Sequence, residues 1–349
     1  MDVCVVGAGV VGLAVARAAA KRGLETLVLE GEATIGHGIS SRNSGVVHAG
    51  LYYAGLPLKQ RWCLEGKRLL YEYCEAKKIP HARCGKLVVA QGSQLDCLEA
   101  LLRSALRAGV EARLLSREET LTLEPLVRCD AALLSPTTGI VDAVALMEAL
   151  RNDAEAYGAT VVTRSRVSRA TPRNGRVDLD VDTAGERDTL ACRRVVNATG
   201  LHAAKLHDDD DGPRHRFAKG SYFACRARPF SRLVYPLPEP GGLGIHATVD
   251  LDGAVRFGPD VEWLAETDPE DLDFAVDETR APRFYDAVRT YYPGLRDGDL
   301  RPDYSGIRPK LDGDFRVVRR DGLISLLGIE SPGLTAALAI AEAVVSTEL

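Results

Sequence analysis

Three glycines and one glutamate near the N-terminus have the types and spacing of a nucleotide-binding site. Gly7, Gly9 and Gly12 directly follow the apolar run 3–6, and Glu30 ends the next apolar run. Glycines at this spacing permit a tight turn, bring backbone N–H groups close to a pyrophosphate, and let the following helix pack on the strand. A carboxylate about 20 residues further on accepts hydrogen bonds from a ribose. The pattern predicts that the chain binds a dinucleotide.

The segment after Glu30 helps to choose between the dinucleotides. A nicotinamide enzyme is expected to continue with regular βαβ units. Here residues 36–45 (GHGISSRNSG) form an irregular polar stretch instead. This interruption favours a flavin dinucleotide.

Length and composition exclude several classes of protein. The chain has 349 residues, of which 46% are hydrophobic and 27% charged, as in ordinary globular proteins. A net charge of −5, with no basic cluster beside aromatic residues, argues against nucleic acid as a partner. No apolar run reaches the roughly 20 residues that span a bilayer. We expect a cytoplasmic protein, with a missing leader or peripheral contact with the inner membrane left open.

Further elements are predicted from periodicity. Apolar residues recur at helical spacing in 59–78, 95–107 and 143–157, whereas strand patterns dominate 219–260. The alternation predicts the fold class α/β (α+β overall) with two interleaved domains. The family resemblance described below implies that one is a Rossmann-like FAD-binding domain and the other a substrate domain on an antiparallel or mixed sheet. The expected boundaries are 1–80, 136–206 and 300–349 for the FAD-binding domain, and 81–135 and 207–299 for the substrate domain.

Four consecutive aspartates, residues 208–211, interrupt this pattern. A metal site is conceivable there, but runs of like charge usually form solvated turns. We predict no metal site.

Nine short segments are typical of one flavoprotein family. They are 41–53 (SRNSGVVHAGLYY), 65–74 (EGKRLLYEYC), 84–90 (CGKLVVA), 138–142 (TGIVD), 219–223 (KGSYF), 242–246 (GLGIH), 257–260 (FGPD), 305–309 (SGIRP) and 331–335 (SPGLT). In these segments the chain resembles the L-2-hydroxyglutarate dehydrogenases and oxidases, of the D-amino-acid-oxidase-like FAD superfamily. It departs from their pattern in two short segments, 206–219 and 308–323, where substrate or quinone contacts of the relatives could be absent.

The resemblance implies FAD with its flavin ring between the two domains, and we expect the FAD to be bound noncovalently. Ser40, Ser41, Asn43, Ser44 and Gly45 would line the pyrophosphate and the ring, Val167 would meet the adenine, and Gly200 would pass near the pyrophosphate. Gly333, Leu334 and Thr335 would present helix N–H groups to the flavin N1 and O2 edge. The predicted set also includes Gly7, Ala8, Gly9, Val10, Val11, Gly12, Glu30, Gly31, Ala198, Gly306 and Arg308.

Hydride transfer from an alcohol to flavin N5 requires a cation for the substrate carboxylate and a base for the hydroxyl proton. Arg308 is the predicted cation, because a guanidinium binds a carboxylate through two parallel hydrogen bonds. His48 and His246 are the two candidate bases. The other predicted substrate-binding residues are Tyr52, Tyr53, Tyr222, Lys219 and Lys86, of which the lysines could hold a second carboxylate.

The leading functional hypothesis is an FAD-dependent dehydrogenase or oxidase. Its substrate would be a small carboxylate, a 2-hydroxy acid and most simply L-2-hydroxyglutarate, which it converts to the 2-keto acid. Two alternatives remain open from sequence: an amine or amino-acid oxidase of the same superfamily (acting on glycine, sarcosine or D-amino acids), and a non-catalytic flavoprotein. The electron acceptor (oxygen, a quinone or an electron-transfer protein) is also open.

Overall fold

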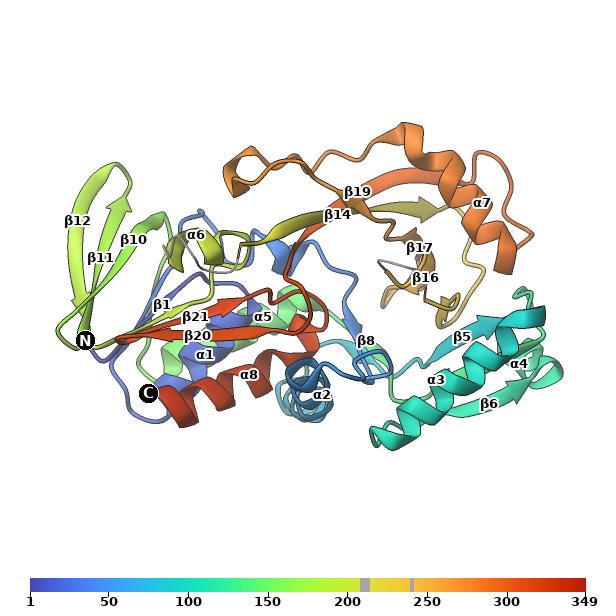
Figure 1. Ribbon diagram of the computed structural model, residues 1–349, viewed down its shortest axis with the longest axis horizontal. Coiled ribbons are helices and arrows are strands. Elements are labelled where there is room, and N and C mark those ends of the chain that lie inside the picture. The colour runs from blue at the N-terminus through green and yellow to red at the C-terminus, as the bar shows by residue number, and fades with distance from the viewer. Residues whose placement is uncertain (208–213, 239–241) are drawn as a thin grey trace.

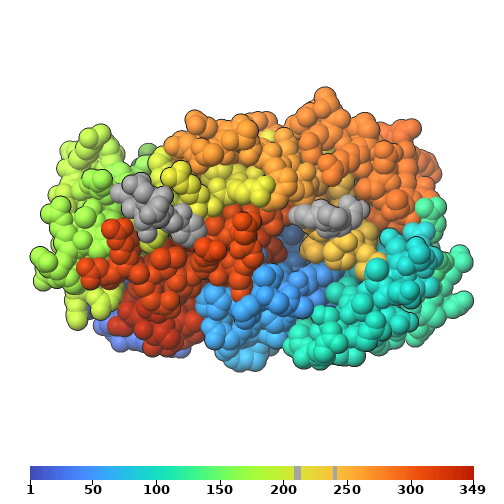
Figure 2. All heavy atoms as spheres, in the orientation of Figure 1, coloured from blue at the N-terminus to red at the C-terminus, as the bar shows by residue number. Residues whose placement is uncertain are grey.

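The computed structural model describes residues 1–207, 214–238 and 242–349, so the aspartates at 208–211 lie outside the described residues. Two large sheets organise the chain (Figure 1). In a space-filling view of the same face, the yellow-to-orange segments form one band above the blue N-terminal and red C-terminal segments (Figure 2). Within the described residues, no helix is long and apolar enough to cross a membrane.

The first sheet has six strands and carries the predicted nucleotide-binding turn. Its order is β20-β21-β13-β1-β2-β9. The strands are β20 (Arg316–Arg320), β21 (Leu323–Leu327), β13 (Arg194–Asn197), β1 (Val3–Val6), β2 (Thr26–Leu29) and β9 (Thr160–Val162). All neighbours are parallel except β20, which is antiparallel to β21. This parallel arrangement confirms the Rossmann-like part of the prediction.

Both faces of the central strand β1 are covered, which explains why it is an apolar run without alternation. Val3 and Val5 of β1 pack in a core with α1 (Val10–Lys21), α5 (Ala143–Ala156) and α8 (Gly333–Glu348). Cys4 and Val6 face the other core, against the small sheet of β10 (Ser165–Arg173), β11 (Arg176–Thr183) and β12 (Glu186–Cys192). Figure 1 shows that three-stranded sheet at the left end of the molecule.

The second sheet has nine strands and is mixed, as predicted for the substrate domain. Its order is β18-β14-β17-β16-β15-β5-β7-β6, with β19 also paired to β14. Within the described residues, β15 and β5 are the one parallel pair of this sheet, and its other neighbouring strands are antiparallel. The strands are β5 (Lys86–Ala90), β6 (Arg113–Ser116), β7 (Ala131–Ser135), β14 (Arg216–Cys225), β15 (Leu233–Tyr235), β16 (His246–Val249), β17 (Val255–Gly258), β18 (Glu262–Trp263) and β19 (Leu300–Lys310).

The remaining elements surround and connect these sheets. Helices α2 (Pro57–Lys77) and α3 (Leu95–Arg107) lie within two residues of their predicted bounds. Strand β19 begins at residue 300, where the FAD-binding domain was predicted to resume, and it pairs with β14 of the nine-stranded sheet. The other elements are β3 (Val46–Val47), β4 (His81–Ala82), β8 (Gly139–Val141), α4 (Arg117–Leu123), α6 (Ala203–His207), α7 (Ala281–Tyr291), and five short 3-10 turns that include η1 (Ile39–Ser41) and η4 (Pro269–Asp271).

A close helix contact fixes the start of α8. A Cβ atom on Gly66 of α2 would lie 2.3 Å from the backbone oxygen of Thr335 and 2.7 Å from the Cα atom of Ala336. Backbone cannot move aside as a flexible side chain can, so only glycine fits at this crossing. The first turn of α8 is therefore held in place by α2.

We expect Gly66→Ala to lower the free energy of unfolding by about 2–3 kcal/mol, because the clash of an overpacked contact outweighs the roughly 1 kcal/mol gain in helix propensity. Urea unfolding followed by circular dichroism measures the change. Glu65→Ala, on the exposed face one residue earlier, is the matched control and should shift the value by less than about 0.5 kcal/mol. Equal stability of the Gly66 variant and the parent would contradict this packing.

Candidate active site

One cavity of about 650 Å³ lies between the two large sheets, and most of the predicted site residues line it. The residues predicted from sequence that line it are Gly7, Gly9, Val10, Val11, Glu30, Gly31, Ser40, Asn43, Ser44, His48, Val167, Ala198, Gly200, Tyr222, His246, Gly306, Arg308, Gly333 and Leu334. Predicted residues outside its lining are Ala8, Gly12, Ser41, Gly45, Tyr52, Tyr53, Lys86, Lys219 and Thr335. Segments far apart in sequence thus converge on one space.

The glycine turn at one end of the cavity requires its glycines. Gly7 has a φ angle of +100°, and a Cβ atom there would lie 2.8 Å from the carbonyl oxygen of Ala198. A Cβ atom on Gly12 would lie 1.9 Å from the oxygen of Gly7, so α1 packs directly against the turn. Helix α1 begins directly after this turn, where Val10 N–H donates to Ser40 Oγ at 3.0 Å. The cavity therefore meets the positive end of a helix.

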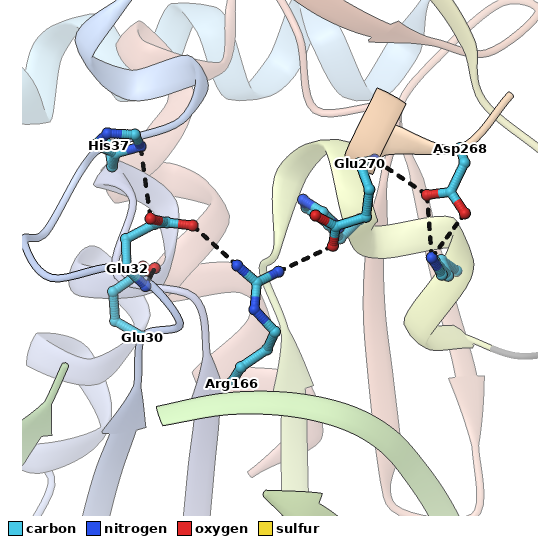
Figure 3. Close-up of polar contacts among 8 residues, drawn as sticks. Glu30, Glu32, His37, Arg166, Asp268 and Glu270 are labelled. Atoms are coloured by element: carbon cyan, nitrogen blue, oxygen red, sulfur yellow. Dashed lines mark hydrogen bonds and ion pairs between the residues drawn. The ribbon is translucent and has the colours of Figure 1, made fainter. Parts of the chain in front are cut away.

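Acidic and basic side chains surround the adjoining part of the cavity (Figure 3). The two carboxylate oxygens of Glu30 accept hydrogen bonds from the N–H groups of Ala8 (2.7 Å) and Glu32 (2.9 Å). Each oxygen has a second lone pair for a ribose hydroxyl. Arg166 of β10 forms ion pairs of 3.0 Å with Glu32 and with Glu270 of η4, which joins segments on opposite sides of the cavity.

The start of α8 forms another wall. No side chain caps this helix at Pro332, and Gly333 and Leu334 line the cavity. Beside them, the buried Glu330 binds the ammonium groups of Lys59 (3.0 Å) and Lys310 (3.1 Å). Burial raises the pKa of Glu330, but the two lysines outweigh it and hold the pKa below its ordinary value.

These features fit FAD. The N-termini of α1 and α8 both open on one cavity, where backbone N–H groups can bind a pyrophosphate and the electron-rich edge of a flavin ring. Two of these groups are already bonded, since Val10 N–H donates to Ser40 Oγ and Gly333 N–H to the carbonyl oxygen of Glu330. The close contacts of Gly7 with Ala198 and of Gly12 with Gly7 let α1 and the end of β13 pack directly against the turn. Glu30 would hold the ribose, the turn at Gly7 and Gly9 the pyrophosphate, and Gly333 and Leu334 the flavin edge.

Arg308 presents a cation to the cavity, where the buried Glu330 carboxylate is within its electrostatic reach. It lies on β19 opposite Ala218 of β14, with its Nη2 atom close to Gly220, where a Cβ atom would approach it to 2.8 Å. Within the described part of the chain, its guanidinium has no hydrogen bond and no ion pair, and it lines the cavity. The neighbouring Tyr222 is buried, which raises the pKa of its hydroxyl, while Arg308 opposes that shift.

His246 has one ring nitrogen fixed by the backbone. Its Nδ1 atom is 2.8 Å from the carbonyl oxygen of Gly244. A carbonyl only accepts, so we assign the hydrogen to Nδ1, and Nε2 keeps its lone pair. The ring stacks on Tyr235 with centroids 3.6 Å apart. Burial, with smaller contributions from Lys86 and Arg308, lowers the pKa of His246 to about 3.

His48 is bound to the start of α8. Its Nε2 atom is 3.2 Å from the hydroxyl of Ser331, and its backbone N–H donates to Thr335 Oγ1 at 3.0 Å. Burial and the charge of Lys86 lower its pKa to about 3. Both candidate bases are therefore neutral at physiological pH, in the form that accepts a proton.

Four predicted substrate-binding side chains lie outside the cavity lining. Lys219 pairs with Asp273 at 3.7 Å, and the hydroxyl of Tyr53 is 3.5 Å from Ser331 Oγ. Lys86 is buried behind the wall next to the half-buried Tyr52, with the Lys86 ammonium 4.5 Å from the centre of the Tyr52 ring.

Comparison with known proteins identifies the family. Residues 2–347 match the DAO family, which is described as FAD dependent oxidoreductase. The chain belongs to this family. The predicted superfamily, the FAD cofactor and the oxidoreductase class are thereby confirmed.

Two curated relatives carry the name of the enzyme family that the motifs resemble. The chain is 42% identical, over 98% of its length, to the mitochondrial L-2-hydroxyglutarate dehydrogenase of Arabidopsis thaliana, of which it covers 82%. It is 33% identical over 74% of its length to the human enzyme of the same name, of which it covers 60%. The chain thus spans less than two thirds of the human relative.

Solved structures agree on the fold. L-alpha-glycerophosphate oxidase from Mycoplasma pneumoniae, solved with FAD bound, has a TM-score of 0.88 at 23% identity, covering 99% of this chain and 94% of that one. Glycine oxidase from Geobacillus kaustophilus has a TM-score of 0.84 at 21% identity, covering 100% and 95%. This similarity confirms the predicted fold class.

Several residues that line the cavity were not among those predicted from the sequence. Tyr235, Leu243, Ser331 and Arg42 line it. Ser331 lies within the predicted SPGLT segment, and a hydroxyl directly before a helix is a recognisable polar signal. Tyr235 carried no such signal, because a tyrosine in an apolar strand is ordinarily a core residue.

The lowered pKa values predict a pH dependence of stability. Each histidine has a folded-state pKa of about 3, against an ordinary value of 6.5, so the unfolded chain binds more protons between these values. The free energy of unfolding should fall as pH decreases below about 6.5, by at most about 1.4 kcal/mol per pH unit for each histidine. Urea unfolding of the flavin-loaded protein at pH 7.5, 6 and 5 measures this slope. A His246→Gln variant with an unchanged slope would contradict it.

Proposed function

We propose that the protein oxidises the hydroxyl of L-2-hydroxyglutarate to give the corresponding 2-keto acid. The observation that carries the proposal is the unpaired Arg308 guanidinium, which shares a cavity with two neutral histidines. The two relatives named L-2-hydroxyglutarate dehydrogenase support the choice of substrate.

The chain's own residues can perform three tasks in this reaction. Arg308 binds the carboxylate next to the reacting carbon through two parallel hydrogen bonds and so fixes the position of that carbon. His246 Nε2 accepts the hydroxyl proton, with the tautomer held by the Gly244 carbonyl. Bound FAD supplies the hydride acceptor. A negatively charged substrate raises the pKa of His246 from its low resting value, which makes the ring a stronger base when substrate is present.

An amine substrate would make different demands on this site than an alcohol substrate. A neutral amine carries its own lone pair and needs no base, whereas an alcohol must lose its hydroxyl proton. A histidine whose tautomer is fixed by a backbone carbonyl is therefore of use mainly for an alcohol, and we favour the hydroxy acid.

The test is anaerobic absorbance of the purified flavoprotein before and after addition of substrate. We expect the flavin bands to bleach with L-2-hydroxyglutarate and to persist with its D-enantiomer. Bleaching by glycine, sarcosine or D-amino acids alone would replace the proposal with amine oxidation. Bleaching by glycerol 3-phosphate alone would assign a different alcohol, because another relative, 27% identical over 97% of the chain, is named glycerol 3-phosphate dehydrogenase.

A further inference from the structure

Lys86 is a buried lysine without a counter-ion. It lies on β5 with a relative exposure of 1%. Among residues 1–207, 214–238 and 242–349, its ammonium group has no hydrogen bond and no ion pair. Burial of an unpaired charge is costly and lowers the pKa of Lys86 to about 7. An anionic acceptor that arrives from outside the chain would stabilise the charged ammonium form.

The groups around Lys86 are aromatic or neutral. Its Nζ atom is 4.5 Å from the ring centre of Tyr52 and 4.7 Å from that of Tyr235. The hydroxyl of Tyr52 is also buried, and within the part of the chain that the structure describes it has no hydrogen-bond partner. The titratable groups that interact with the ammonium are His48, His246 and Cys63, none of which is a carboxylate. Two unsatisfied donors, an ammonium and a hydroxyl, thus lie together.

This pair of donors adjoins the cavity. Tyr235, whose ring face contacts the Lys86 ammonium, lines the cavity, as do His48 and His246. The charges of Lys86 and Arg308 both act on His246. The proposed base is therefore within electrostatic reach of two cations, of which Arg308 is the one on the cavity surface.

We propose that Lys86 and the Tyr52 hydroxyl form the binding site for the second carboxylate of a dicarboxylate substrate. Arg308 holds the carboxylate beside the reacting carbon, and the other end of the molecule supplies the acceptor that Lys86 and Tyr52 lack. Movement of the long lysine side chain past Tyr235 brings its ammonium to the cavity. This inference rests on the proposed function and adds to it the residues that select a dicarboxylate over a 2-hydroxy monocarboxylate.

Binding of unreactive analogues to the flavin-loaded protein tests the site directly. Glutarate has two carboxylates and butyrate has one, and flavin absorbance changes report the dissociation constant of each. In Lys86→Met we expect the constant for glutarate to rise roughly 10- to 100-fold, as loss of a hydrogen bond to a charged group implies. The constant for butyrate should change much less. Lys67→Met is the matched control, since that lysine bonds Thr137 outside the cavity lining.

Tyr52→Phe is a second variant that tests the same site if Lys86→Met does not fold. It removes only a hydroxyl that has no hydrogen-bond partner among the described residues. It should also weaken the binding of glutarate more than the binding of butyrate. The proposal is overturned if the dissociation constants of glutarate and butyrate rise equally in Lys86→Met and Tyr52→Phe, or if neither constant rises.

The outcome also separates this inference from the proposed function. Flavin bleaching by L-2-hydroxyglutarate with unchanged glutarate binding in both variants would overturn the second-carboxylate site alone. Failure of L-2-hydroxyglutarate to bleach the parent flavin, with glutarate binding still dependent on Lys86, would overturn the proposed substrate alone.

Discussion

Replacing Arg308 by methionine is expected to lower kcat/KM for L-2-hydroxyglutarate by roughly 10³-fold. Two charge-assisted hydrogen bonds to one carboxylate are worth about 4 kcal/mol together, and Arg308 has no competing acceptor in the described part of the chain. Steady-state rates with an artificial electron acceptor measure the loss. The flavin content, read from absorbance, should remain at the parent level if Arg308 acts on substrate.

Arg308→Lys is the informative comparison. Lysine keeps the charge but cannot form the two parallel bonds, so we expect an intermediate loss of about 10- to 100-fold. A loss of less than tenfold in the methionine variant would show that the substrate carboxylate binds elsewhere. A loss of flavin in both variants would instead assign Arg308 to the cofactor, as the sequence also allowed.

Replacing His246 by glutamine is expected to lower kcat by about 10²- to 10⁴-fold, the range for loss of a general base. Glutamine keeps hydrogen-bonding capacity but does not take up a proton at working pH. The rate of flavin bleaching after anaerobic mixing isolates the oxidation step from reoxidation. The rate in the variant should rise with pH, because hydroxide then takes the place of the histidine.

His48→Gln is the matched variant. His48 Nε2 shares a hydrogen bond with Ser331, whereas His246 Nε2 is the nitrogen left with a lone pair, so we expect the smaller loss at His48. A larger loss at His48, with pH rescue, would exchange the two roles. Losses below tenfold in both variants would remove histidine from the proton transfer.

The fold was predictable where it depends on local sequence. The turn at Gly7, Gly9 and Gly12 has steric requirements that only glycine meets, and a Cβ atom at Gly12 would lie 1.9 Å from backbone. The apolar run of β1 is uninterrupted because both faces of that strand are buried. Such constraints act within a few residues and can therefore be recognised without coordinates.

The candidate site was predictable only in part. The motifs around His48, His246 and Arg308 suggested a shared site, and the structure brings these three residues to one cavity. It also places Lys86 and Tyr52 behind the wall and puts Tyr235 on it. Strand alternation alone does not decide this, because Tyr235 and Lys86 become neighbours only when β15 pairs with β5 across nearly 150 residues of chain.

The sequence by itself determined the nucleotide-binding turn, the acidic residue at the end of β2 and the family, because each is written in short segments whose chemistry is local. Only the tertiary structure decided which titratable groups are neutral, which cations lack a partner and which donors meet an acceptor. These properties depend on burial and on distances between β5, β16 and β19, and they arise when segments far apart in sequence close around one cavity.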